Sequence, residues 1–281
     1  GVTTMFELPE VETVRRDLDR ELVGKKVKAV EAASMKVLGR YKNRKAFTGQ
    51  LEGVKITAVG RRGLYLTIEL DGESVLVVDL GSSGSLRRNA NKDEVLPDTE
   101  VIITFTQHGQ LRLVDPDGTA AMFVVDAESL ADELPELDEL GLDPVESPVS
   151  WTAFGRELLQ RKAKLKTLLT DPEFVVGIGD IYADEILFQA GLRHDRLSNS
   201  LSSQEIRRLH RALVGTLHDA IKYRGTSVDA RPFIDPFGNP GEFAEHLEVW
   251  GRHGELSGRS RSPIQRVKFG GSWTYFCETQ V

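Results

Sequence analysis

The cleanest basic stretch of this sequence, a weak signal for binding anions, lies near its C-terminal end. Four cationic side chains occur between residues 256 and 277, a segment without any acidic residue: Arg259, Arg261, Arg266 and Lys268. Arginine and lysine side chains hold the phosphate groups of nucleic acids. The stretch therefore predicts contact with a nucleic-acid backbone, although charge on a short hairpin is equally typical of a solvated surface.

The sequence has one cysteine, Cys277, so an intramolecular disulfide is impossible. No apolar run approaches the roughly 20 residues that span a bilayer. Residues 1–4 lack the basic and apolar regions of a signal peptide, and we interpret them as a tail ahead of Met5. These features predict a cytoplasmic protein with no membrane contact.

Charge is unevenly divided along the chain. The net charge is −7, and residues 1–150 hold 18 basic and 27 acidic side chains, against 18 and 16 in residues 151–281. An acidic surface is poorly suited to coating a polyanion. The acidic first half therefore favours a protein partner as one alternative to nucleic acid.

The first half of the chain indicates one helix followed by strands. Apolar residues recur at helical spacing from Pro9 to Gly24. Six short apolar or alternating runs follow, at residues 54–59, 64–70, 74–80, 101–106, 110–114 and 120–125. Turn pairs such as Asp71-Gly72 separate them, which predicts a β-sandwich or barrel. The acidic, proline-containing residues 126–148 favour a covering helix and then a linker.

The second half indicates helices and a terminal hairpin. Helical patterns occupy residues 151–160, 165–170, 181–190 and 202–223, and Ser202 with Glu205 forms a capping box at the start of the last helix. Two short strands, 263–269 and 272–276, meet at Gly270-Gly271. A length of 281 residues allows more than one domain.

Several segments, in their order along the chain, resemble the formamidopyrimidine-DNA glycosylase and endonuclease VIII family. They are ELPEVETVRR at 7–16, RRGLYL at 61–66, LGSSGSLR at 80–87, LGLDP at 140–144 and VVGIGDIYADE at 175–185. An ordered series of this kind is far more specific than one short motif. The resemblance extends over about residues 5–281.

The resemblance implies an α+β fold. Its parts are an N-terminal β-sandwich with an N-terminal helix at 5–138, a helix–two-turn–helix domain at 149–236 and a β-hairpin finger at 240–281. DNA is held between the two halves in this family. Its members flip a damaged base out of the helix, attack the sugar with an N-terminal proline amine and then cleave the backbone.

The position of the family's proline nucleophile is occupied by Phe6, whose side chain has no nucleophilic atom. The neighbouring carboxylates remain as Glu7 and Glu10. The resemblance gives the first of them a proton-transfer role at the opened sugar. Without the amine, we expect Phe6 to pack in the core and Glu7 to cap the helix.

Other departures fall on residues that hold DNA in the family. A strand lysine is replaced by Leu64, the base-replacing wedge is lost at Ser82 and Asp117, and a phosphate-binding asparagine is Asp180. Lys166 keeps its family position and is expected to contact a DNA backbone or to be a solvated surface group.

The finger also departs from the family pattern. Tetrahedral zinc requires four ligands such as cysteine thiolates, and the four positions hold Ser257, Ser260, Cys277 and Gln280. Ser272 replaces the hairpin arginine. The sequence predicts a zincless finger, no metal site and no cofactor.

We therefore predict a protein that keeps the glycosylase fold but lacks glycosylase and lyase activity, binding double-stranded or damaged DNA weakly at most. Two alternatives stay open. One is a glycosylase of altered mechanism in which Glu7 or Glu10 activates water. The other is an adaptor that binds a partner protein.

Overall fold

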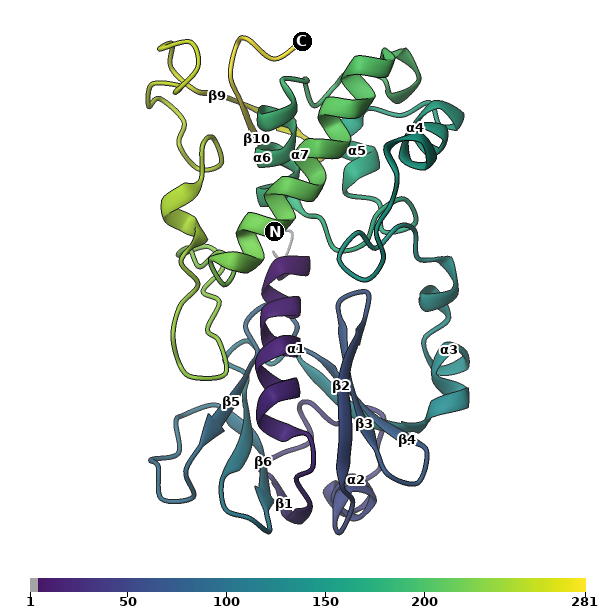
Figure 1. The fold of residues 1–281 in the computed structure, drawn as a ribbon. Helices are drawn as coiled ribbons and strands as arrows, with labels where there is room; N and C mark the ends of the chain where they lie inside the picture. Colours follow the sequence, from purple (N-terminus) through teal and green to yellow (C-terminus); the bar gives the residue numbers. More distant parts are fainter. Residues whose placement is uncertain (1–4) are drawn as a thin grey trace. The chain divides into compact units, whose positions relative to one another are not determined.

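The structure, a computed structural model, describes residues 5–281, so the tail expected at residues 1–4 lies outside the described part. The chain folds into two compact units (Figure 1). Residues 5–138 and 224–242 form the sandwich unit, and residues 139–223 and 243–281 form the helical unit. The segment 224–242 therefore groups with the sandwich, whereas the sequence placed most of it with the helices.

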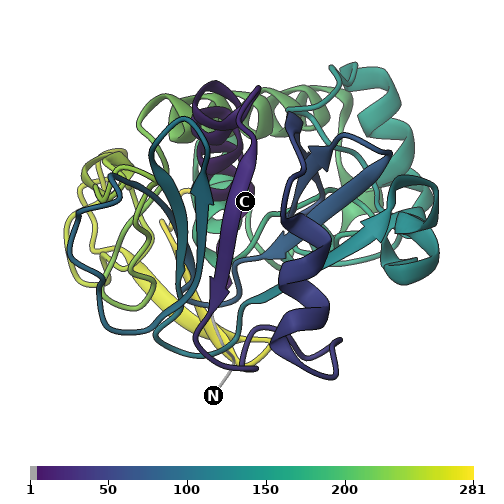
Figure 2. The same ribbon diagram turned by 90° about the horizontal axis from the view of Figure 1, so that it is seen from below.

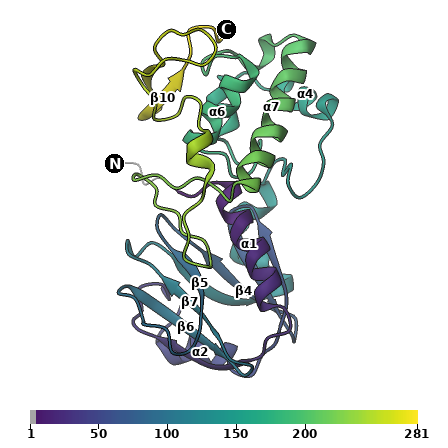
Figure 3. The ribbon, with the colours of Figure 1, turned by 60° about the vertical axis from the view of Figure 1, so that its left-hand side comes forward.

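Two four-stranded antiparallel sheets build the sandwich unit. The first sheet, in spatial order, contains β1 (Val27–Ala32), β6 (Thr99–Phe105), β7 (Gln110–Val114) and β5 (Ser85–Asn89). The second contains β2 (Ile56–Arg62), β3 (Tyr65–Leu70), β4 (Ser74–Asp79) and β8 (Ala121–Asp126). Figure 3 shows β5, β7 and β6 side by side in one layer.

Alternation along the strands directs one set of side chains into a shared core. Strand β2, for example, buries Ile56, Val59 and Arg61 while the residues between them are more exposed. The buried cluster also takes in residues of α1 (Leu8–Leu22) and α2 (Arg44–Leu51). Figure 2 shows α2 beside the strands, where it contacts β1 and β8. The sandwich thus provides the rigid base on which α1 is packed.

The helical unit contains four helices of the expected extent. They are α4 (Trp151–Gln160), α5 (Leu165–Leu169), α6 (Asp180–Ala190) and α7 (Ser203–Lys222). The capping box of α7 is present, because the Ser202 hydroxyl accepts from the Glu205 N–H at 3.2 Å and the Glu205 carboxylate accepts from the Ser202 N–H at 2.9 Å. Reciprocal capping satisfies donors that the first helical turn leaves open.

A terminal hairpin completes the helical unit. Strands β9 (Gln265–Phe269) and β10 (Ser272–Phe276) pair antiparallel, as the sequence predicted, with Ser272 opposite Phe269. Gly270 and Gly271 both adopt positive φ at the turn, which a side chain would strain. No helix in residues 5–281 has the length and apolar character needed to cross a bilayer.

Some elements differ from the sequence expectation. The covering helix of residues 126–148 is broken into short pieces, η1 (Ala127–Ser129), α3 (Leu130–Glu133) and η2 (Pro135–Glu139), because proline cannot continue a helix in its interior. Helix α2 and strands β1 and β5 were not predicted. The paired arginines of β5 conceal its strand pattern, and the Arg88 guanidinium, which donates to the Gln110 carbonyl at 2.8 Å, is satisfied only in the folded sheet.

Candidate active site and phosphate-binding residues

Two carboxylates lie at the start of α1. Glu7 is the N-cap residue, and Glu10 is the third helical residue. The Glu7 backbone N–H donates to Glu10 Oε1 at 3.0 Å, so Glu10 satisfies a donor at the helix start. Both residues are buried, with exposed fractions of 3% and 0%. The helix N-terminus therefore fixes two negative charges inside the sandwich unit.

The guanidinium of Arg231 binds both carboxylates. Its Nη1 lies 2.7 Å from Glu7 Oε2, and its Nη2 lies 2.5 Å from Glu10 Oε1. The Arg231 side chain is 0% exposed. A buried charge requires a partner of opposite sign. Arg231 supplies that partner from the segment 224–242, more than 200 residues along the chain.

Glu10 also contacts the loop at residues 225–226. Its Oε2 accepts the Thr226 N–H at 3.2 Å, while its Oε1 accepts from Glu7 and pairs with Arg231. A Cβ at Gly225, which has φ +82, would lie 3.0 Å from Glu10 Cγ. Glycine thus permits the close approach of this loop. The two oxygens of Glu10 thus hold this loop and Arg231 against the start of α1.

Phe6 lies in the sandwich core. Its side chain is 3% exposed and packs edge-to-face on Phe233, with ring centroids 5.5 Å apart. Burying an aromatic ring of this size stabilises the fold by about 2–3 kcal/mol. The ring therefore anchors the chain directly ahead of Glu7.

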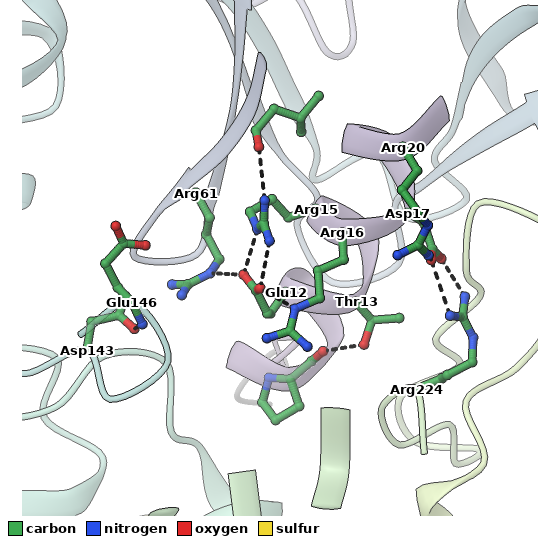
Figure 4. Close-up of polar contacts among 12 residues, drawn as sticks. Glu12, Thr13, Arg15, Arg16, Asp17, Arg20, Arg61, Asp143, Glu146 and Arg224 are labelled. Atoms are coloured by element: carbon green, nitrogen blue, oxygen red, sulfur yellow. Dashed lines mark hydrogen bonds and ion pairs between the residues drawn. The ribbon is translucent and has the colours of Figure 1, made fainter. Parts of the chain in front are cut away.

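Further ion pairs hold α1 in place (Figure 4). Glu12 accepts from Arg15 and Arg16, and from the buried Arg61 at 3.1 Å. Burial alone would raise the pKa of Glu12, but the hydrogen bonds from Arg15 and Arg16 outweigh it and the pKa is lowered. On the next turn, Asp17 pairs with Arg224. These contacts set the axial position of α1, and with it Glu7.

The two turns that carry Ser82 and Asp117 are joined to each other. Ser82 Oγ donates to Asp117 Oδ2 at 2.8 Å, and Thr119 Oγ1 accepts the Ser82 N–H at 2.9 Å. A Cβ at Gly81 would lie 2.5 Å from Thr119 Oγ1. Leu64, at the β2–β3 turn, packs against the core. Each of these side chains therefore has contacts within the sandwich unit.

Lys166 is a buried ion-pair partner. Its Nζ lies 3.1 Å from Asp180 Oδ1, 3.0 Å from Asp184 Oδ1 and 2.6 Å from Thr274 Oγ1. Its side chain is 3% exposed, whereas that of Asp180 is 36% exposed. Ser272 Oγ also donates to Asp180 Oδ1 at 3.1 Å. The expectation that Lys166 is a solvated surface group is therefore wrong, because two carboxylates and a hydroxyl surround its ammonium.

Asp184 carries an altered pKa in this cluster. Burial disfavours its charged form and raises the pKa to about 7, although Lys166 and the Tyr275 N–H oppose the shift. The Asp180 carboxylate raises it further. Two carboxylates thus share one lysine, and Asp180 is the carboxylate with access to solvent.

The basic stretch of the finger is divided by its contacts. Arg259 Nη1 donates to the Phe188 carbonyl, and its guanidinium lies 4.2 Å from the Phe188 ring centroid. Arg266 and Lys268 flank the Trp273 ring at 4.1 and 4.3 Å. Arg259 therefore anchors the finger to α6, although all four basic residues of the stretch are exposed.

The four finger positions form a hydrogen-bonded cluster. Cys277 Sγ lies 3.1 Å from Ser257 Oγ and 3.3 Å from Ser260 Oγ. Gln280 accepts the Cys277 N–H at 2.7 Å and donates to the Leu192 carbonyl at 2.8 Å. Burial would raise the pKa of the Cys277 thiol, but the hydroxyls of Ser257, Ser260 and Thr279 outweigh it and lower the pKa to about 7. One thiol, two hydroxyls and a carboxamide do not fit zinc.

Several residues of these sites were not found from the sequence. Arg231 has no local pattern that distinguishes it from a surface charge, and Arg61 and Asp184 lie in segments that carry the family resemblance but were not singled out. Each becomes significant only through a partner far along the chain. For Arg231 the available signal was Gly225, a glycine in the same segment, where the backbone passes close to Glu10.

Comparisons with known proteins define the class of this chain. The model of the formamidopyrimidine-DNA glycosylase N-terminal domain matches residues 5–122, and that of the formamidopyrimidine-DNA glycosylase H2TH domain matches residues 140–231. The chain belongs to the formamidopyrimidine-DNA glycosylase family. The resemblance and the α+β fold inferred from the sequence are thereby confirmed.

Individual relatives are similar over nearly their whole length. The formamidopyrimidine-DNA glycosylase of Pelotomaculum thermopropionicum is 38% identical over 275 residues, 98% of each chain. That of Geobacillus kaustophilus is 34% identical, covering 97% of this chain and 98% of the relative. Among solved structures, the MutM (Fpg) protein of Thermus thermophilus has a TM-score of 0.83 and 34% identity, with 97% of each chain covered. A complex of Lactococcus lactis Fpg with DNA containing an abasic site has a TM-score of 0.85 and 29% identity, covering 96% of this chain and 97% of that chain.

These findings overturn the expectation of a protein without glycosylase activity. Relatives 34–38% identical over almost the entire chain are glycosylases by name, which points to an enzyme. The adaptor alternative is overturned with it. The sequence interpretation failed because it counted missing side chains one by one. It did not foresee that Glu7, Glu10 and Arg231 are still assembled.

Proposed function

We propose that this protein is a DNA glycosylase that releases damaged bases, formamidopyrimidines among them. The observation that carries the proposal is the full-length similarity to formamidopyrimidine-DNA glycosylases. The paired carboxylates beside Phe6 support it. DNA as substrate also favours a cytoplasmic location, as the sequence predicted.

Glu7 is the group best placed to act in the reaction. Phe6 offers no nucleophilic side-chain atom, and Glu7 is the carboxylate directly next to it, at the N-cap of α1. In the proposed step a water oxygen forms a bond to the sugar C1′ while the bond from C1′ to the base nitrogen breaks. Glu7 accepts the water proton, and the departing base is protonated from solvent. The products are the free base and an abasic site.

Base release from a damaged duplex tests the proposed function. We expect free formamidopyrimidine or 8-oxoguanine to appear in the supernatant, and strand breaks to appear only after alkali treatment. A covalent adduct trapped by borohydride would reject the water mechanism while keeping the glycosylase assignment. If neither the duplex with formamidopyrimidine nor the duplex with 8-oxoguanine released its base, the glycosylase assignment itself would be rejected.

We further propose that Asp180 limits the grip of this protein on DNA. Its carboxylate lies at the N-terminus of α6 and forms an ion pair with the Lys166 ammonium. It therefore competes with a DNA phosphate for this ammonium and for the helix N-terminus. Asp180→Asn should therefore tighten binding to duplex DNA by roughly 3- to 10-fold at low salt and steepen the log–log salt dependence by about one phosphate contact.

Fluorescence anisotropy over a salt series measures this effect. Asp219→Asn, an exposed charge on α7, is the matched control for a simple change in net charge. Equal gains in the two variants would show that Asp180 has no specific role at Lys166.

We propose that the finger folds without zinc. The support is the contact set of Cys277 with Ser257, Ser260 and Gln280, which satisfies these side chains through hydrogen bonds. We expect the melting temperature to be unchanged by a strong chelator, because no ligand set for a structural ion is present. Calorimetry with and without the chelator checks this. A fall in the melting temperature that added zinc restores would contradict it.

A further inference from the structure

A groove on the helical unit shares no residue with the sites described above. Its volume is about 570 Å³. Helices α4 and α7, which pack side by side, form its walls (Figures 1 and 3). The lining residues come from the start of α4 and the middle of α7: Trp151, Arg207, His210, Arg211, Val214 and Gly215. None of them is acidic.

The floor of the groove is apolar and open. Val214 is 42% exposed although it lies on a packed helix. A Cβ added at Gly215 would have no neighbour within 4 Å. His210 forms a fixed wall, because its Nε2 donates to the Val149 carbonyl at 2.6 Å and its ring lies 5.7 Å from that of Phe154. The groove can therefore accept an apolar side chain without rearranging its walls.

The rim of the groove carries two arginines with no carboxylate partner in the described part of the chain. Arg207 lies over the Trp151 ring, 4.2 Å from its centroid, and Arg211 is exposed. Other arginines of the same unit do have such partners: Arg161 with Glu157, Arg193 with Asp195 and Arg196 with Glu205. Positions four apart on a helix face the same side, so Arg207 and Arg211 present two adjacent cations.

We propose that this groove binds a short acidic segment of a partner protein. Carboxylates of the segment pair with Arg207 and Arg211, and one apolar side chain rests on Trp151 and Val214. Guanidinium groups bind carboxylates through paired hydrogen bonds, and an apolar anchor with a charged rim is a recurrent mode of peptide recognition. The acid-free lining matches an acidic ligand by charge.

Nucleic acid fits the groove less well. A bound strand needs a track of cations along its backbone and open aromatic faces for its bases. The lining of the groove offers two arginines, which is a short track for a backbone of several phosphates. A phosphate backbone also brings no apolar group for Val214.

A labelled peptide tests the proposal on the full chain. The probe is a fluorescein-labelled run of aspartates followed by leucine and phenylalanine, and the control peptide has asparagines in place of the aspartates. We expect saturable binding of the acidic peptide alone. The double variant Arg207→Glu with Arg211→Glu should weaken it by about 10-fold or more, in a salt-dependent manner. Val214→Ser should weaken it independently of salt.

Lys222→Glu is the control, since it makes one charge reversal of the same kind at the far end of α7 and should leave peptide affinity unchanged. Three results would overturn the proposal. The two peptides could bind equally, the double variant could bind the acidic peptide as tightly as the parent does, or binding could fail to saturate below about 1 mM. Arginine-dependent binding of a single-stranded oligonucleotide in preference to the peptide would overturn it in favour of nucleic acid. Arginine-dependent dimerisation in light scattering would overturn it in favour of a second copy.

Discussion

Replacing Glu7 by glutamine is expected to reduce base release by about 10²- to 10⁴-fold, the contribution typical of a positioned general base. Glutamine keeps the shape of the side chain but cannot accept the proton of the attacking water. Glu7 is also the N-cap of α1 and the partner of Arg231 at 2.7 Å, so the effect on chemistry must be separated from an effect on folding. Single-turnover base release under saturating enzyme measures the chemistry directly.

Glu21→Gln serves as the control for this experiment. Glu21 lies on the same helix and is partly exposed, and its contact with Arg88 is long at 3.6 Å. We expect this variant to release bases at the parent rate. If Glu7→Gln did the same while its circular dichroism and melting temperature matched the parent, Glu7 would be excluded from the reaction and another group would have to activate water.

The second large effect is expected for the stability of the sandwich unit. Arg231→Met should lower its free energy of unfolding by about 3–5 kcal/mol, because Glu7 and Glu10 would remain buried without their counter-charge. Adding Glu10→Gln to Arg231→Met should recover part of the loss, since one uncompensated charge is then removed. Arg20→Met is the contrasting control, as Arg20 pairs with Asp17 but is 64% exposed, and it should cost about 1 kcal/mol or less.

The position of the tryptophans determines how this prediction is measured. Trp151, Trp250 and Trp273 all belong to the helical unit, so tryptophan fluorescence does not report on the sandwich. Hydrogen exchange at the amides of α1 and β2 reports on it directly, and the fluorescence transition serves as an internal reference for the other unit. Protection of α1 within about 1 kcal/mol of the parent in Arg231→Met would show that the buried pairs contribute little.

Local pattern was sufficient for most of the secondary structure. The apolar spacing from Pro9 to Gly24 predicted α1, and the capping box at Ser202 predicted the start of α7. Strand β5 escaped because its adjacent arginines are satisfied only across the sheet. Helix α2 buries just two side chains, Phe47 and Leu51, which is too few to give a clear helical period.

The sequence by itself determined the family, the order of the elements and the identity of the residues at each family position. It also showed that the finger lacks four thiolates, since ligand chemistry is a property of the side chains alone. Only the tertiary structure decided what the charged residues do. Lys166 is bound by Asp180 and Asp184, and Arg231 joins Glu7 to Glu10. The physical reason is that the energy of a charge depends on its burial and on the distance to its partner, and neither quantity is fixed until segments far apart in the chain have packed together.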